Sequence, residues 1–147
     1  MTMLPGPVLD VPDSDEDLKN LILNDPHLSP YHGGRVYFRI PANNSTWPVI
    51  VLYRIGGGKV GGEVQEINAR YQFDILSGKV DAANEVAVRQ LALLLESTID
   101  NLSGPIQQGG TVFLNGIVTS HVSKPDRDTG RPGRVLDAVL TLRSATS

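Results

Sequence analysis

A glycine-rich stretch with one lysine, Gly56 to Gly62, is the first segment whose residue types could do chemistry. Glycine backbone amides and a lysine ammonium together can cradle a phosphate. The segment lacks the pattern of a phosphate-binding loop, because Lys59 is followed by Val60 instead of Ser or Thr, and a strand is predicted next. The pattern therefore favours a mobile loop between strands over a nucleotide site.

The segment DRDTG, residues 126–130, resembles the start of a calcium loop, in which oxygen ligands alternate along the chain. The pattern then fails, because no Glu stands near the twelfth position, where Asp137 lies within a predicted strand. Arg127 and Arg131 would also repel a cation. A solvated turn is the expected structure.

Histidines are the remaining candidates for catalysis or metal binding. The chain has three, His27, His32 and His121, without HxxxH or HExxH spacing and without a cysteine to complete a site. A small hydrolase or ligand-binding module that uses His121 with Asp126 or Asp128 is one alternative, but no nucleophile elbow accompanies these residues. We expect each histidine to lie on the surface or at a strand end, and the protein to be no enzyme and to need no metal or cofactor.

Local basicity is the last chemical signal, and it surrounds a polar segment, Ser123 to Gly133, that predicts a protruding hairpin loop. Two interpretations remain open: a solvated tip, or a loop that contacts an acidic protein surface or passing DNA. The net charge of −3 gives no overall attraction to DNA or to an anionic membrane. The basic residues are Lys124, Arg127, Arg131 and Arg134.

Length and composition place these residues in one globular domain. The chain has 147 residues, of which 40% are apolar and 20% charged. Its longest apolar runs are far shorter than the roughly 20 residues that span a bilayer, so no membrane partner is expected. The N-terminus has no basic segment of a signal peptide, and the chain has no cysteine, so we expect a protein made and kept in the cytoplasm.

The element that organises the chain is the stretch Ile67 to Ser77. Apolar and polar residues alternate along it, which predicts a central strand with one buried face. Asp81 can cap the helix that follows, Ala83 to Ile99, which we expect to fold over that face. Its predicted apolar stripe comprises Ala83, Ala87, Leu91, Leu94, Leu95 and Thr98.

The remaining elements follow from the same periodicities. Prolines in residues 1–12 predict an extended arm, either frayed or ordered on a neighbouring subunit. A short helix capped by Asp13 or Ser14 is predicted next, followed by antiparallel strands at 36–40 and 49–55. The second of these strands is expected to be covered on both faces. Gly104 to Gly110 is expected to be a loop. With strands at 112–122 and 135–142 the order is α-β-β-β-α-β-β. We predict a single α+β domain over 13–147, with a mixed or antiparallel sheet and the long helix packed on one face.

Several of these residues carry a resemblance. Trp47, Pro48, Arg54, Gly56 and Gly57 stand in an apolar strand that ends in glycines. A second strand with an arginine and aromatics then leads into the long helix, and it contributes Arg70, Gln72, Asp74 and Gly78. Over Asp15 to Arg143 this order resembles the tail terminator proteins of long-tailed bacteriophages, including those of actinobacteria. The longer Pro-rich arm and the GGGKVGGE segment depart from the family pattern.

The resemblance implies a hexameric ring in the tail-neck region of the virion. Such a ring sits on the head-proximal end of the tail tube, ends tube polymerisation and joins the head connector, with DNA passing through its lumen. Neck or head-completion proteins and tail tube subunits are the alternatives within the virion. The polar row of the central strand is either a ring contact or a solvated face, and the candidate contacts are Arg70, Gln72, Asp74, Lys59, Lys124, Arg127, Arg131 and Arg134.

Overall fold

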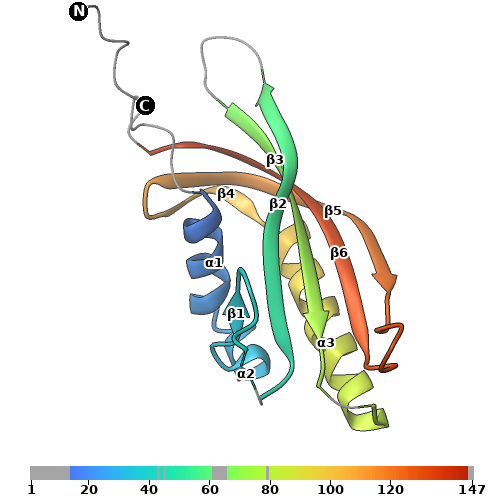
Figure 1. Ribbon diagram of the computed structural model, residues 1–147. Coiled ribbons are helices and arrows are strands. Elements are labelled where there is room, and N and C mark those ends of the chain that lie inside the picture. Colours follow the sequence, from blue (N-terminus) through green and yellow to red (C-terminus); the bar gives the residue numbers. More distant parts are fainter. Residues whose placement is uncertain (1–13, 43, 45, 61–65, 79, 146–147) are drawn as a thin grey trace, which may run out of the picture.

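A six-stranded curled sheet carries the helices on its inner side in the computed structural model, which describes residues 14–42, 44, 46–60, 66–78 and 80–145 (Figure 1). The strand order is β1-β2-β3-β6-β5-β4, and only the pair β1 and β2 is parallel. The predicted α+β class is confirmed, whereas the predicted arm over residues 1–12 lies outside the described residues. The elements are α1 (Ser14–Asn24), α2 (Ser29–His32), β1 (Val36–Tyr37), β2 (Val49–Val60), β3 (Glu66–Leu76), α3 (Ala82–Asp100), β4 (Ser103–Gln108), β5 (Thr111–Ser123) and β6 (Gly133–Ser144).

Strand β3 is central, as its alternation predicts. It pairs antiparallel with β2 on one side and with β6 on the other. Ala69, Tyr71, Phe73 and Ile75 are all fully buried on its inner face. The polar residues between them point to the opposite, outer face, because successive strand side chains alternate.

Helix α3 covers the inner face, and the Asp81 carboxylate caps it by accepting the Asn84 N–H at 2.7 Å. The predicted orientation is wrong in part. Leu91 and Leu95 are buried, but Ala83 is exposed. Three residues that the predicted stripe left out are buried instead: Val88, Ala92 and Ile99.

Helix α1 is tied to the sheet by the acidic residues of its first turn. The Tyr71 hydroxyl donates to Asp15 Oδ1 at 2.6 Å and accepts from the Ser14 hydroxyl at 2.8 Å. Thr111 donates to Asp17 Oδ2 at 2.6 Å. Of the two predicted caps, Asp13 lies outside the described residues, and the side chain of Ser14 bonds Tyr71. Burial, with the Asp15 hydrogen bond, raises the pKa of Tyr71, so the phenol stays protonated.

Two segments predicted to be loops are strands. Residues Gly56–Val60 continue β2 and pair with Glu66–Arg70, and residues 61–65 lie outside the described residues. The predicted loop at 104–110 instead contributes most of β4, at the sheet edge, where Pro105 is tolerated. In both cases pairing with a neighbouring strand outweighs the low strand propensity of glycine and proline.

The first strand is shorter than predicted and runs in the other direction. Only Val36 and Tyr37 form β1, which is parallel to β2, whereas an antiparallel pair over 36–40 was expected. The short connection had suggested a hairpin, but Phe38 is 42% exposed and leaves the sheet. The expectation that β2 is covered on both faces is also wrong, because Tyr53 and Ile55 are 38% and 39% exposed.

His32 is fully buried, so the prediction of a surface position is wrong for it. The Gly34 N–H donates to its Nδ1 at 2.9 Å, which leaves the proton on Nε2 to donate to the Ile22 carbonyl at 3.0 Å. Burial lowers the pKa of His32 below 6.5.

Of the described helices, none has the length and apolar character needed to cross a membrane.

We expect the folded state to lose stability as the pH falls through 6.5, the pKa of an unperturbed histidine. In that range the unfolded chain binds a proton at His32 that the folded chain does not, so protonation favours unfolding. The stability that neutral His32 contributes is fully present above pH 6.5, and it is lost as the pH falls through the lower pKa of the folded state. Denaturant unfolding at a series of pH values measures it, and His32→Gln should flatten the profile. An equally steep profile in that variant would assign the effect to other groups.

Candidate functional site

The outer face of the sheet is the broadest candidate surface, because the core cluster and both long helices lie on the inner side. The register places residues of four strands in rows across it. One row contains Tyr53, Gln72, Asp137 and Ser120. The rows on either side are Val51, Asp74, Val135 and Val122, and Gly56, Arg70, Val139 and Ile117.

The polar side chains predicted on β3 do lie on this face. The hydroxyl of Tyr53 on β2 hydrogen-bonds with two of them, Gln72 and Asp74. Gln72 Nε2 donates to Asp74 Oδ1 at 2.9 Å and to the Tyr53 hydroxyl, which donates to Asp74 Oδ2 at 3.3 Å. Burial raises the pKa of Tyr53, and the nearby charges of Asp74 and Asp137 raise it further. Arg70 is exposed beyond this network.

Asp137 is the member of this face that the sequence did not single out. Its Oδ1 is buried without a hydrogen-bond partner in the part of the chain that the structure describes. It lies beside Gln72 in the register, and Asp74 lies one row away. This end of the outer face therefore concentrates negative charge that the described residues do not neutralise with an ion pair.

The basic loop between β5 and β6 is an ordered turn. Lys124 N–H donates to the Gly133 carbonyl at 2.9 Å, and the Asp126 carboxylate accepts the N–H groups of Asp128 and Thr129 at 2.8 and 3.0 Å. These two N–H groups lower the pKa of Asp126, because they stabilise the charged carboxylate. Asp126 is thereby engaged in holding the turn, and the predicted hairpin connection is confirmed.

The backbone at residue 59 lies far from the basic loop between β5 and β6. Residue 59 pairs with Ile67 at one end of the sheet, whereas Arg134 pairs with Ile75 at the other. Eight residues of strand separate Ile67 from Ile75, or about 27 Å. Figure 1 shows these two ends, with the end of β2 and the start of β3 at the top and the β5–β6 connection lower down, beside the start of α3. Lys124, Arg127 and Arg131 are exposed there, and Arg134 is half-buried.

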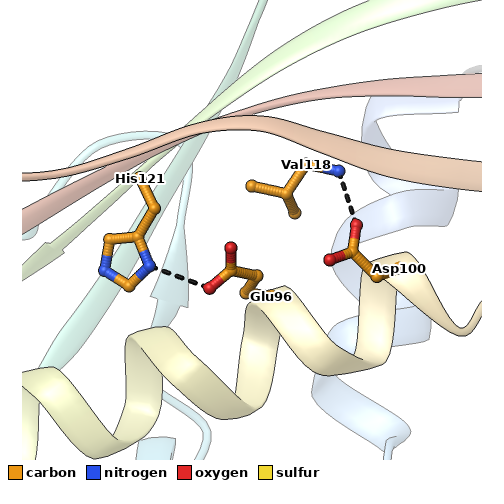
Figure 2. Close-up of polar contacts among 4 residues, drawn as sticks. All are labelled: Glu96, Asp100, Val118 and His121. Atoms are coloured by element: carbon orange, nitrogen blue, oxygen red, sulfur yellow. Dashed lines mark hydrogen bonds and ion pairs between the residues drawn. The ribbon is translucent and has the colours of Figure 1, made fainter.

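His121 pairs with a residue that the hydrolase alternative did not consider. Its Nδ1 lies 2.9 Å from Glu96 Oε2 on α3, and its Nε2 is buried without a partner among the described residues. Nearby, the Val118 N–H donates to Asp100 Oδ1 at 2.7 Å (Figure 2). The hydrolase alternative paired His121 with Asp126 or Asp128, whereas in the structure His121 contacts Glu96. Both contacts instead hold α3 against β5.

No three acidic or histidine side chains among the described residues gather as a metal site would require. One cavity, of about 480 Å³, lies where α1, α3 and β4 meet. Its lining is mostly apolar, and Asp25 and His27 contribute the ionisable groups. Asp25 is engaged in accepting the backbone N–H of His27 at 2.8 Å.

No model of a protein family matches the sequence, and a search of curated proteins finds no match. A solved structure does share the fold. It is a chain of the "Virion of native gene transfer agent (GTA) particle", with a TM-score of 0.64 and 10% sequence identity. The alignment covers 85% of the present chain and 89% of the chain in the particle. At this identity the likeness establishes the fold alone.

Sequence reasoning thus found the polar row and the basic loop but missed the acidic and apolar residues around them. Tyr53 and Asp137 lie far from β3 in the sequence, and only strand pairing brings them beside Gln72. The periodicity of β6 could have indicated that Asp137 points outward. Its neighbours Leu136 and Ala138 are apolar and buried.

Proposed function

We propose that the chain is a structural virion protein of a phage-like particle. The observation that carries this proposal is the shared fold with a chain of the gene transfer agent virion, which extends over most of both chains. A non-enzymatic role is consistent with the geometry, since His121 is engaged by Glu96 and Asp126 by its own turn. The virion is accordingly the proposed location.

More narrowly, we infer a tail terminator of a long-tailed phage, with an actinobacterial host suggested by the sequence resemblance. The chain would form a hexameric ring that ends the tail tube and meets the head connector, with DNA passing through. The outer face of the sheet, left uncovered by the described helices, supports a role in assembly, because large uncovered faces commonly mark interfaces. A neck protein and a tube subunit are the alternatives within the virion.

The test is the mass of the purified chain over a range of concentrations, combined with the length of tail tubes polymerised in its presence. A terminator should form one closed ring, free or on tube ends, and should stop tube growth. Open polymers of the chain itself would identify a tube subunit. A chain without effect on tube length that binds head connectors would identify a neck protein.

Reversing the charge of the loop, by Lys124→Glu, Arg127→Glu and Arg131→Glu together, should impair joining of capped tails to heads. All three side chains are exposed, so the melting temperature should stay unchanged. The measurement is the fraction of heads that join purified tails. Arg39→Glu, at an exposed position that follows β1, is the charge-reversal control for this assay. Full joining by the triple variant would remove the loop from the contact surface.

A further inference from the structure

Two exposed surfaces on opposite sides of the molecule have matching patterns. The first is the outward side of α3, turned away from the buried stripe. Val86 and Leu93 are 40% and 50% exposed there, and Arg89 lies between them at i+3 from Val86. Among the described residues Arg89 has no ion-pair partner. This side of α3 is therefore an apolar stripe interrupted by one unpaired positive charge.

The second surface is the outer face of the sheet. Ile117 and Val122 on β5 are 57% and 48% exposed, and the register places them beside Val139 and Val135 on β6. The row between these two valine-containing pairs contains Asp137, and on β3 the flanking rows continue with Arg70 and Asp74. On β5 and β6 the sheet therefore presents apolar side chains on either side of the Asp137 carboxylate, of which one oxygen is buried and has no partner among the described residues.

The two surfaces carry charges of opposite sign, and the spacings of their apolar groups differ by about 4 Å. Val86 and Leu93 are seven residues apart on a helix, or about 10 Å. The rows of Val135 and Val139 are four residues apart on a strand, or about 14 Å. A positive charge at the centre of one surface would face the negative charges of Asp137 and Asp74 on the other. Complementary charges fix the register of an interface more than they add to its affinity.

We propose that the outward side of α3 in one copy of this chain docks on the outer sheet face of the next copy. The contact is head-to-tail, because two different surfaces meet, and such contacts close into rings when the rotation between copies allows it. The inference deepens the proposed ring and rests on that function. It identifies Leu93 and Ile117 as central contacts of the subunit interface.

Two single substitutions, one on each surface, provide the test. Leu93→Glu places a charge on the α3 surface, and Ile117→Glu places one on the sheet surface. Both side chains are at least half exposed, so both variants should have the melting temperature of the wild type. Each variant alone should fail to form rings. Mixed in equal amounts, they should form a heterodimer and nothing larger, because one intact helix side can still dock on one intact sheet side. Phe38→Glu, at a 42% exposed position after β1 that belongs to neither surface, should keep the ring.

Native mass spectrometry of differently labelled variants gives the readout. If the wild-type chain assembles only on tube ends, the same variants are compared there by tube length. Rings formed by either glutamate variant would overturn this interface while leaving the terminator function intact. A mixture that stays monomeric would also overturn it. A wild-type chain that neither assembles nor limits tube length would overturn the proposed function as well.

Discussion

Replacing Leu91 with alanine is expected to lower the free energy of unfolding by about 2 to 5 kcal/mol. Leu91 is fully buried on the side of α3 that packs against the sheet. Truncation removes its apolar contacts and leaves a cavity that a helix held against the sheet cannot close. Two contacts hold the helix against β5, the bond from the Val118 N–H to Asp100 and the contact between His121 and Glu96. Chemical denaturation of the two proteins measures the difference.

The matched control is Leu93→Ala, two residues further along the same helix. Leu93 is 50% exposed, so its truncation should change stability by no more than about 0.5 kcal/mol. The same change should weaken ring formation if α3 docks on a neighbouring sheet. Equal destabilisation by the two substitutions would contradict the orientation of the helix. The pair of leucines thus separates folding from assembly on one element.

Replacing Gly116 with alanine is expected to destabilise the fold by about 1 to 3 kcal/mol, because the site is already filled. A Cβ at this position in β5 would lie 2.7 Å from Leu140 Cδ2 and 2.9 Å from the carbonyl oxygen of Ile99 in the last turn of α3. The leucine methyl can move, but the backbone oxygen cannot move without shifting the helix. Thermal or chemical unfolding measures the loss.

Gly56→Ala is the control for this prediction. Gly56 also lies in a strand, but a Cβ there would meet nothing within 4 Å, and its φ is not in the left-handed region. Its replacement should leave stability unchanged or raise it slightly, since alanine reduces the freedom of the unfolded chain. If both alanines proved neutral, the close approach of β5 to α3 would be refuted.

The parts of the fold that the sequence predicted well are those in which one local pattern decides the structure. Alternation along Ile67–Leu76 identified the central strand, and Asp81 identified the start of α3. The prolines, glycines and charged residues between β5 and β6 correctly predicted a hairpin loop that connects these two strands. In each of these segments the propensity of the residues and the final environment agree.

The predictions that failed concern segments whose structure depends on distant partners. Gly56 to Val60 has weak strand propensity, and it is a strand because Glu66 to Arg70 pairs with it. The direction of β1 depends on how the chain returns from Tyr37 to Val49, which no local pattern encodes. His32 is buried because the Ile22 carbonyl, ten residues earlier, satisfies its ring proton.

The same division applies to the candidate surface. The α+β class, the outward row on β3 and the exposed basic loop could be predicted from the sequence, because strand alternation and turn composition are local properties. The folded structure was needed to show that Tyr53 and Asp137 join this row, that residue 59 lies far from the basic loop, and that Glu96 contacts His121. Those relations come from strand register and from packing of α3 on the sheet, which depend on contacts between residues far apart in the chain.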